Sequence, residues 1–429
     1  MPTLRHSLAD WLAWLETLHP SEIELGLERA RAVRDRLGLT KTPFAIVTVA
    51  GTNGKGSAVA MLEHSLHAAG YRVGAYSSPH LIDYNERVRV ATREASDADL
   101  VAAFARVEAA RGETPLTYFE FGTLAALELF REQQIEIAVL EVGLGGRLDA
   151  VNAWDADVAI VTSIGTDHQD WLGPDRESIG REKAGVFRPG HCAISGDRDS
   201  PRSLRDHAYA IGARWLCLGE DFHAEPMEHG WRWRSAQNTQ AGLPFPAMRG
   251  NYQVNNAACV LMALECLAER FPVTASDIRA GLTQAVLPGR FQTLAGQPTV
   301  VLDVAHNREA AQVLAETLGT QPVNGRTLAV CAMLRDKPRE DVVRILAPHI
   351  AAWHVAGLDG TRGTTGQDMQ AVLTGAGVRT GVSVHASVEA AYAAARLLAG
   401  PEDRIVVFGS FHTVGAILRT LQLRDRHHG

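Results

Sequence analysis

The sequence predicts an α/β protein with two domains, a larger one on a doubly wound, mostly parallel sheet and a smaller second α/β domain. Three observations support this. Short β-branched runs alternate with helical segments, as in repeated βα units. Two runs, 135–142 and 158–162, are almost continuously apolar, which is typical of strands buried on both faces of a sheet. The alternation restarts after a stretch at 287–298 that is rich in proline and glycine, which marks a domain boundary.

The first elements follow from local patterns. The run 45–49 predicts a strand that ends at glycines, and residues 58–69 predict a helix that also stops at a glycine. Residues 73–76 predict the next strand. Ser96 is a good N-cap with acidic residues in the turn that follows it, so a helix begins there. Residues 119–134 predict another helix.

The middle of the chain has a different pattern. Residues 231–234 alternate with period two, which indicates an antiparallel excursion. Helical periodicity returns at 252–269 and 276–286. We therefore place the first domain at 1–287, a hinge linker at 288–298 and the second domain at 299–429. The strands predicted for the second domain are 300–304, 328–331, 353–356, 382–385 and 405–408.

Composition excludes several classes of protein. The 429 residues are 46% hydrophobic and 21% charged, which argues against disorder. A net charge of −7 provides no general attraction for nucleic acid or anionic membranes. No apolar run approaches the roughly 20 residues that cross a bilayer. The five cysteines form no Cys-x-x-Cys pair, so we expect small buried side chains in a reduced, cytoplasmic protein, without a structural zinc.

Residues 50–57, Ala-Gly-Thr-Asn-Gly-Lys-Gly-Ser, carry the strongest local signal. They lie between a predicted strand and a predicted helix, the context of a phosphate-binding loop. Glycines let backbone N–H groups turn toward phosphates, and Lys55 can bridge the terminal phosphates. The strict G-x-x-x-x-G-K-[ST] pattern fails, because Val49 stands at the first glycine position and Gly56 separates Lys55 from Ser57. The alternative is an ordinary glycine-rich turn.

This departure from the strict pattern resembles the ATP loop of the Mur ligase superfamily, and within it the folate branch of folylpolyglutamate and dihydrofolate synthases. The resemblance covers nearly the whole chain, and it implies a P-loop-type domain followed by a smaller Rossmann-like α/β domain. Its other motifs follow in order: Ser77-Ser78-Pro79-His80, Glu86-Arg87-Val88, Thr117-Tyr118-Phe119-Glu120, 141–149, Thr166-Asp167-His168, 181–185, 287–290, 303–307 and 409–411.

The resemblance implies that ATP and a divalent cation bind at the loop. The residues around the phosphates are Gly54, Lys55, Gly56 and Ser57, and the implied metal ligands are Ser78, Glu141 and His168. Hard oxygen ligands favour Mg²⁺. Because imidazole is an unusual partner for Mg²⁺, we expect Mn²⁺ to substitute for it, and a monovalent cation such as K⁺ is a further candidate. Taken alone, Glu141 fits equally a helix-cap or ion-pair carboxylate, and His168 fits a hydrogen-bonded loop histidine.

Lys183 matches a lysine that is carbamylated by CO₂ in this branch and in several Mur ligases. The carbamate would turn a cation into a carboxylate that helps to hold a second metal ion. Its formation requires some neutral amine, and therefore a pKa depressed by burial or by neighbouring cations. Taken alone, Lys183 fits a surface lysine in a salt bridge.

For the binding of nucleotide and glutamate, the resemblance points to the second domain and to the segments that precede it. It implies that Asp303 contacts ATP and that His306 helps to bind glutamate. Arg290 and Asn256 match nucleotide-binding positions, although they also fit a hinge ion pair and a helix cap. The run that usually continues His-Asn-Pro has Arg308 in place of the proline.

The implied reaction is ATP-dependent amide formation, in which L-glutamate attacks an acyl phosphate of dihydropteroate or of a reduced folate. The implied substrate-binding residues are Glu24, Leu25, Gly26, Thr117, Tyr118, Phe119, Glu120, Leu148, Asp149, Ala150 and Ser410. Taken alone, Tyr118 and Phe119 also fit core positions at the start of a helix. Glu24 is one methylene longer than the usual aspartate.

Other functions remain open at this point. Only about 50 residues precede the loop, whereas cell-wall Mur ligases carry a UDP-sugar-binding domain there. The alternatives are a monofunctional folylpolyglutamate synthase, a cell-wall Mur ligase and an ATP-dependent switch without ligase chemistry. We expect a monomer that takes small-molecule substrates only.

Overall fold

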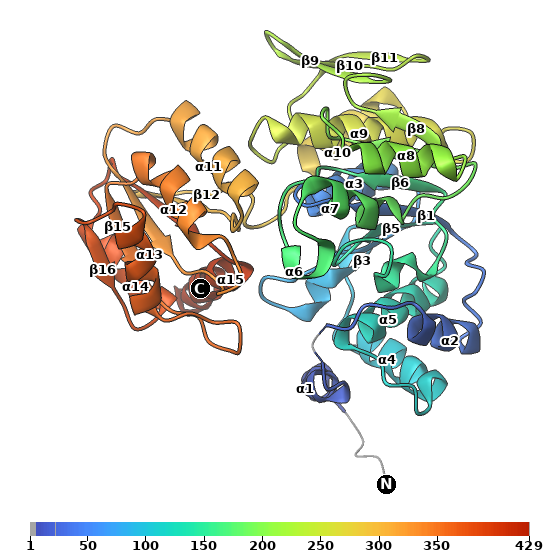
Figure 1. The fold of residues 1–429 in the computed structure, drawn as a ribbon, viewed down its shortest axis with the longest axis horizontal. Coiled ribbons are helices and arrows are strands. Elements are labelled where there is room, and N and C mark those ends of the chain that lie inside the picture. The colour runs from blue at the N-terminus through green and yellow to red at the C-terminus, as the bar shows by residue number, and fades with distance from the viewer. Residues whose placement is uncertain (1–5, 22, 429) are drawn as a thin grey trace. The chain divides into compact units, whose positions relative to one another are not determined.

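The computed structural model describes residues 6–21 and 23–428, with side chains up to residue 422. It contains two compact units, each with its own sheet (Figure 1). The first unit comprises Met1–Gly165, Gln169–Ala247 and Gln253–Val286. The second comprises Thr166–His168, Met248–Tyr252 and Leu287–Gly429. Two short segments that precede residue 287 are therefore part of the second unit.

The first unit is built on an eight-stranded sheet with the order β4-β3-β2-β5-β1-β6-β7-β8. The central strand β1 pairs in parallel with β5 on one side and β6 on the other. Only β3 and β4, at one edge, are antiparallel to their neighbours. The strands are β1 (Ala45–Ala50), β2 (Val73–Tyr76), β3 (Val88–Val90), β4 (Arg93–Glu94), β5 (Ile137–Glu141), β6 (Val158–Val161), β7 (Cys192–Ser195) and β8 (Arg214–Cys217).

Helices cover both faces of this sheet. The connection through α3 moves across the sheet from β1 to β2, and the connection through α5 moves back in the opposite direction to β5. Because crossovers are right-handed, α3 and α5 lie on opposite faces of the sheet. The predicted doubly wound α/β class is confirmed. The helices are α1 (Leu8–Leu18), α2 (Glu28–Arg36), α3 (Lys55–Ala68), α4 (Asp97–Arg111), α5 (Tyr118–Glu132), α6 (Gln169–Leu172), α7 (Arg176–Ala184), α8 (Arg202–Ala210), α9 (Tyr252–Leu267) and α10 (Ala275–Gln284), with 3₁₀ turns η1 (Tyr84–Arg87) and η2 (Ala150–Ala153).

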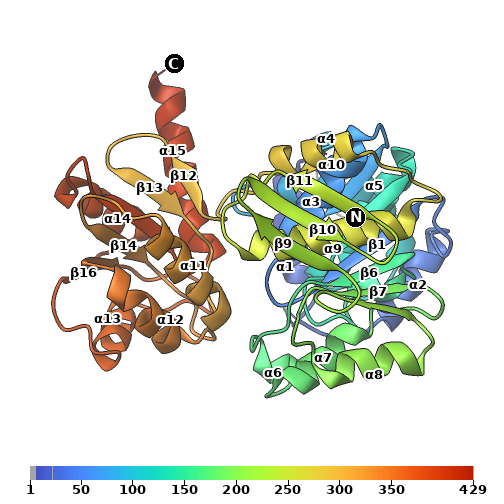
Figure 2. The same cartoon turned by 90° about the horizontal axis from the view of Figure 1, so that it is seen from above.

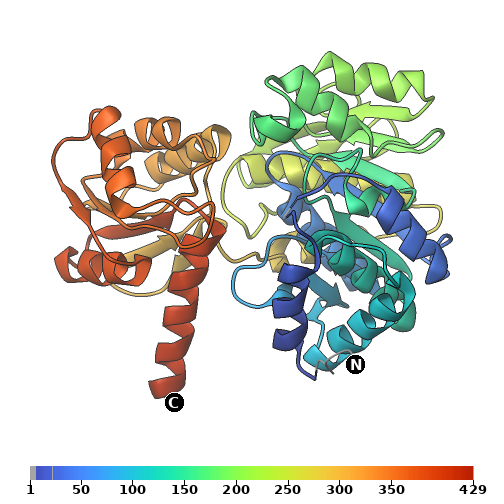
Figure 3. The same cartoon turned by 60° about the horizontal axis from the view of Figure 1, so that its bottom comes forward.

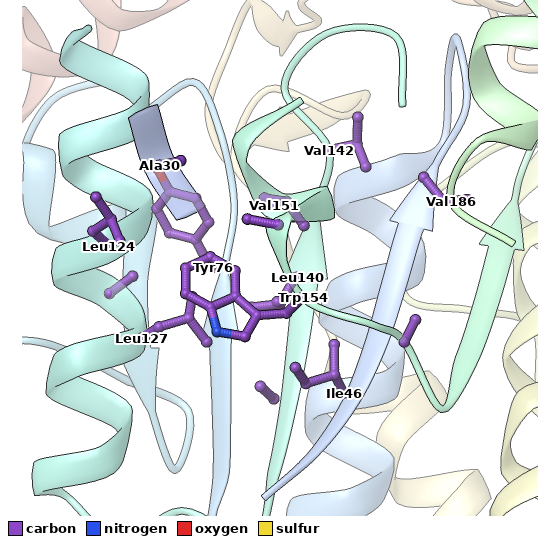
Figure 4. Packing of buried hydrophobic residues seen from close by; sticks show 14 of the residues in the cluster. Ala30, Ile46, Tyr76, Leu124, Leu127, Leu140, Val142, Val151, Trp154 and Val186 are labelled. Atoms are coloured by element: carbon purple, nitrogen blue, oxygen red, sulfur yellow. The ribbon is translucent and has the colours of Figure 1, made fainter. Parts of the chain in front are cut away.

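The core of the first unit lies between the sheet and its helices. Figure 4 shows Tyr76 of β2 with Leu124 and Leu127 of α5 and with Trp154, whose indole nitrogen donates to the carbonyl of Leu39 at 2.7 Å. These residues are almost completely buried. The buried core fixes the strand ends, and the polar residues of the site follow directly after those ends.

A three-stranded antiparallel sheet packs over α9, as the alternation at 231–234 predicts (Figure 2). Its strands are β9 (His223–Met227), β10 (Gly230–Arg234) and β11 (Thr239–Leu243). Trp231 and Trp233 of β10 are fully buried, and the Trp233 indole donates to the Ala258 carbonyl of α9 at 3.1 Å. The apolar face of this excursion therefore holds α9 in place.

The second unit has a six-stranded sheet with the order β12-β13-β17-β14-β15-β16. All pairs are parallel except the edge strand β12, which lies within the predicted linker at 288–298. Part of that stretch thus belongs to the second sheet. α15 follows β17 and extends beyond the sheet (Figure 3). The elements are β12 (Gln292–Leu294), β13 (Thr299–Leu302), β14 (Thr327–Cys331), β15 (Ala352–Val355), β16 (Val382–Val384) and β17 (Arg404–Phe408), with α11 (Arg308–Thr320), α12 (Arg339–Leu346), η3 (Ala347–His349), α13 (Gly366–Gly375), α14 (Val388–Leu398) and α15 (Phe411–His428).

Within the described residues, no helix has both the length and the apolar character that a bilayer crossing requires.

Candidate functional site

The glycine-rich loop connects the central strand β1 to α3. Gly54 is the N-cap residue of α3 and has φ +88°, a conformation that favours glycine. A Cβ atom at Gly54 would lie 2.5 Å from Oδ1 of Asn256, so a side chain is excluded there. Lys55 Nζ donates to the carbonyl oxygens of Gly51 at 3.0 Å and Thr52 at 3.3 Å. The loop thus places N–H groups, a helix N-terminus and an ammonium group together, which is an anion-binding arrangement.

The first turn of α9 closes this loop from one side. The Gln253 side-chain amide donates to the buried hydroxyl of Ser57 at 3.1 Å, and Asn256 donates to Gln253 at 3.0 Å. Asn256 lies inside α9, so the helix-cap interpretation is wrong. Gln253 was not predicted, because nothing in its local sequence shows that it reaches a loop almost 200 residues away.

Lys183 lies near the end of α7 and is buried, with 3% of its surface exposed. Its Nζ donates to the carbonyl of Gly51 at 3.0 Å, the same oxygen that accepts from Lys55. The interpretation of Lys183 as a surface salt-bridge lysine is therefore wrong. A Cβ atom at Gly146 would lie 3.0 Å from the Lys183 backbone, so Gly146 allows α7 to approach the loop.

Two of the three predicted metal ligands lie together. Glu141 is the last residue of β5, pairs with Val49 of β1 and is buried, and its Oε2 accepts from the Ser78 backbone N–H at 3.3 Å. Glu141 is therefore not a helix cap. His168 is in the second unit, where its Nε2 lies 3.4 Å from Lys337 Nζ.

The donors fit a hard divalent cation that also binds phosphate. Among the residues that the structure describes, no three His, Cys, Asp or Glu side chains gather as a cage for a metal ion. A carboxylate and a hydroxyl-bearing residue beside a phosphate loop instead suit Mg²⁺, which binds through one or two carboxylates, substrate phosphates and water.

The three segments predicted for the pteridine side come together in the first unit. The Gly26 N–H donates to the Leu148 carbonyl at 3.3 Å, which joins residues 24–26 to 148–150. Arg29 links residues 24–26 to the third segment, residues 117–120. Its guanidinium contacts Glu24, donates to the Glu24 carbonyl at 3.0 Å and donates to both Glu120 oxygens at 3.2 Å.

Glu120 is buried and fully engaged in holding this region. It also accepts from the Thr117 N–H at 2.8 Å, while Thr117 Oγ1 accepts from the Glu120 N–H, forming a capping box at the start of α5. The structure therefore gives Glu120 and Thr117 a positioning role. Arg29 was not predicted, because its partners are 5 and 91 residues away.

Tyr118 and Phe119 are half-buried at this same helix start. Phe119 packs on Gly143, where a Cβ atom would lie 2.7 Å from Phe119 Cζ, and its ring centroid lies 6.0 Å from that of Tyr76. The Arg87 guanidinium lies 5.6 Å from the Tyr118 ring centroid. Burial raises the pKa of Tyr118 to about 12. The two rings contact the core and retain accessible surface.

Asp149 holds the loop after β5 in shape. Its two oxygens accept from the N–H groups of Leu144 at 2.9 Å and Val151 at 3.0 Å, and it caps η2, which begins at Ala150. Burial raises the pKa of Asp149 to about 6, although these hydrogen bonds and the charge of Lys55 oppose the rise.

In the second unit, Asp303 follows β13 and is half-buried. Its oxygens accept from the N–H groups of Phe291 and Ala305, each at 2.8 Å. Burial raises the pKa of Asp303, and the charge of Arg290 limits the rise. The Arg290 guanidinium lies 5.3 Å from the Phe411 ring centroid. Arg290 therefore interacts electrostatically with Asp303 inside the second unit. This interaction corresponds to the hinge ion pair that was the alternative role of Arg290.

His306 and His168 share a carboxylate that was not assigned a role from sequence. Asp167 Oδ2 lies 3.6 Å from His306 Nε2, and Asp167 Oδ1 accepts from the buried Lys337 at 2.8 Å. Burial alone would raise the pKa of Asp167, but the hydrogen bond from His306 and the charge of Lys337 hold it well below its usual range. His306 Nδ1 donates to the Val304 carbonyl at 2.8 Å, since a carbonyl only accepts.

Asn307 and Ser410 occupy helix starts. Asn307 caps α11 and accepts from the Ala310 N–H at 2.9 Å, so Arg308 takes the first helical position, where proline is also favoured. Ser410 is buried immediately before α15, and its hydroxyl accepts from the His412 N–H at 3.1 Å.

Comparison with known proteins gives the same class of protein. Residues 49–264 match the Mur ligase middle domain, and residues 289–411 match the Mur ligase glutamate ligase domain. The chain is 46% identical over 423 residues to the dihydrofolate synthase/folylpolyglutamate synthase of Escherichia coli, covering 99% of this chain and 97% of the relative. It is 38% identical to the Haemophilus influenzae protein of the same name, covering 95% and 96%.

Solved structures agree. E. coli FolC in complex with DHPP and ADP superposes with a TM-score of 0.93 at 46% identity, covering 99% of this chain and all of that one. A bifunctional folylpolyglutamate synthase/dihydrofolate synthase with Mn, AMPPNP and L-glutamate bound gives 0.89 at 44% identity, covering 97% and 98%. The chain belongs to the Mur ligase family, in its branch of dihydrofolate synthase/folylpolyglutamate synthases.

Proposed function

We propose that this protein is an ATP-dependent amide ligase that adds L-glutamate to dihydropteroate and to reduced folates. The observation that carries the proposal is the convergence of Lys55 and Lys183 on the Gly51 carbonyl in the phosphate loop, in the unit that also joins the three pteridine-side segments. In this reaction a carboxylate of the pteridine substrate receives the γ-phosphate of ATP. The amino group of L-glutamate then displaces phosphate.

The residues of the first unit position the anions and stabilise their charge. Gly54, Gly56 and the N-terminus of α3 present N–H groups to the phosphates, and Lys55 stabilises the charge that develops during transfer. Ser57, Ser78 and Glu141 would hold Mg²⁺, and Mn²⁺ would substitute for Mg²⁺. His168, which belongs to the second unit, stays a predicted metal ligand. When bound, the cation neutralises the phosphate oxygens; K⁺ is a further candidate ion.

On the pteridine side, Phe119 supplies a partly exposed ring suited to a flat heterocycle. Glu24, Leu25 and Gly26 would line the same pteridine pocket from one segment, and Leu148 and Ala150 from another. Thr117, Tyr118, Glu120 and Asp149 hold the shape of the pocket. In the second unit, Asp303 and Arg290 would contact the nucleotide, while His306 and Ser410 would bind glutamate. Asn256, in the first unit, is likewise a proposed nucleotide contact. We propose that the protein acts as a monomer.

The test measures ADP release from the full-length protein with dihydropteroate alone, with glutamate alone and with both. We expect release only with both, and equally with a folate that already bears one glutamate. Release that needs no glutamate would indicate an ATP-dependent switch. Because the chain is also 30% identical to the folylpolyglutamate synthase of Lacticaseibacillus casei, a monofunctional enzyme is the second candidate. Glutamate-dependent release with the folate but not with dihydropteroate would establish it.

The carbamate on Lys183 is part of this proposal. Its support is that Lys183 is buried and that its Nζ shares the Gly51 carbonyl with Nζ of Lys55. With ¹³C-labelled CO₂, we expect a carbamate carbon signal that disappears in Lys183→Ala. Activity of that variant should be lost and partly restored by a short carboxylate. A wild-type protein that is active in CO₂-free buffer without this signal would contradict the assignment.

A further inference from the structure

Two cysteines that the ligase reaction does not use face each other in the first unit. α9 runs across the end of β7, since a Cβ atom at Gly196 would lie 2.6 Å from Cys259 Sγ of α9. Cys192 lies four residues before Gly196, which is about 13 Å along a strand. Cys266 lies seven residues after Cys259, which is about 10 Å along a helix. The two cysteines therefore lie next to each other at the other end of the contact, where each thiol shifts the pKa of the other.

The surroundings of this pair favour a thiolate on Cys192. Arg214 of β8 is directly opposite Cys192 in the sheet register. The hydrogen bond from Cys266 and, after it, the charge of Arg214 lower the pKa of Cys192 to about 7. Both cysteines are only partly buried. A cavity of about 500 Å³ is lined by Arg214, which is opposite Cys192, and by Glu265 of α9, which directly precedes Cys266.

The remaining cysteines lack these properties. Cys217, Cys259 and Cys331 are buried, and burial raises the pKa of each thiol. A buried thiol with a raised pKa is a poor nucleophile, because the thiolate is the reactive form. The chain thus contains one adjacent, partly accessible thiol pair and three inert thiols.

We infer that Cys192 and Cys266 form a redox-active dithiol that is converted to a disulfide by small-molecule disulfides. The Cys192 thiolate attacks one sulfur of the small disulfide, whose S–S bond breaks and releases one thiolate. The released thiolate takes up a proton, and a mixed disulfide remains on Cys192. The sulfur of Cys266 then loses its proton to solvent and attacks Cys192 Sγ, which releases the second small thiol. Two protein thiols are oxidised while one small disulfide is reduced to two thiols.

The experiment treats the reduced, full-length protein with glutathione disulfide and then traps free thiols by alkylation. Intact mass should show the loss of two thiols without a retained glutathione, and peptide mapping should show Cys192 joined to Cys266. Cys266→Ser should stop at the mixed disulfide and retain one glutathione on Cys192. Cys192→Ser should react at least tenfold more slowly, and the matched control Cys217→Ala should behave as wild type.

Reduced Cys192→Ser and Cys266→Ser should retain wild-type ADP release, which shows that they are folded. If either variant does not fold, peptide mapping of the wild type still decides the question. The inference is overturned if the oxidised wild type lacks the Cys192–Cys266 peptide, or if glutathione is retained on any other cysteine in Cys266→Ser.

Discussion

Lys55 and Lys183 donate to one backbone oxygen, that of Gly51, each at 3.0 Å. Two ammonium groups that share one acceptor repel each other unless an anion or a change of charge compensates them. Lys55 is therefore placed for a phosphate group, and the carbamate proposed on Lys183 would remove the second positive charge. Substitutions here should separate activity from folding.

We expect Lys55→Ala to reduce glutamate-dependent ADP release roughly 100- to 1000-fold with both pteridine substrates, because it removes a charge that stabilises the transferring phosphoryl group. The melting temperature should stay close to that of the wild type. The control is Lys41→Ala, which removes an exposed lysine in the same unit and should have no effect. Steady-state ADP release and thermal unfolding check the two expectations. Retained turnover in folded Lys55→Ala would contradict the role of Lys55.

A second prediction concerns the pH dependence of stability at Asp149. Its pKa is about 6 in the folded protein and about 4 in the unfolded chain, so between these values the folded state binds the additional proton. Its contribution to the free energy of unfolding is full below pH 4 and is lost as pH rises through 6. Two pKa units correspond to about 3 kcal/mol.

Urea unfolding of wild type and Asp149→Asn at pH 4 to 7 tests this contribution. The difference between the two proteins should change with pH over this window, with the wild type losing stability relative to the variant as pH rises. Asp175→Asn is the opposite control. The hydrogen bond from the Ser178 N–H lowers the pKa of Asp175, so its contribution is lost as pH falls. If the free energies of unfolding of wild type and Asp149→Asn change in parallel with pH, the pKa of Asp149 is not raised in the folded protein.

At the scale of helices and strands, local signals were sufficient for most of the fold. Strand 73–76 was predicted at its observed bounds, and Ser96 caps α4 as expected, because strand burial and N-caps depend on adjacent residues. The glycine loop was recognisable for the same reason. Arg29, Gln253 and Lys337 were not, since each acts through partners that the fold brings from far along the chain. The strand β12 was missed because a three-residue edge strand in a Pro/Gly-rich stretch has no periodicity to detect.

Two helices of the first unit begin with equivalent capping boxes, which gives a matched pair of substitutions. Thr117 caps α5 through Glu120, and Thr274 caps α10 through Asp277. Thr117→Ala and Thr274→Ala should each lower the free energy of unfolding by about 1 kcal/mol. Only Thr117→Ala should raise KM for the pteridine substrates, because only α5 carries Phe119. Equal effects on KM would show that the start of α5 does not shape the pocket.

At the scale of the whole chain, activity on two pteridine substrates leads to a prediction about the ring of Phe119. In the proposed function, the two substrates would share the phosphate loop but would place their attacked carboxylates differently along the pteridine pocket. Phe119→Ala should therefore change kcat/KM unequally for dihydropteroate and for a monoglutamylated folate, whereas Lys55→Ala should reduce both alike. A ratio of the two activities that is unchanged in Phe119→Ala would argue against Phe119 as a substrate contact.

The position of β1 at the centre of its sheet has a consequence for how the protein is made. Ala45 pairs with Ile137 and Val47 with Val158, so the strand that carries the phosphate loop has no sheet partners until much later residues have been synthesised. Gln253, which contacts Ser57, follows later still. Closing such long loops slows folding. On the ribosome the loop should therefore emerge early but bind nucleotide only after α9 has left the exit tunnel, and in refolding experiments a fluorescent ATP analogue should report the slowest phase.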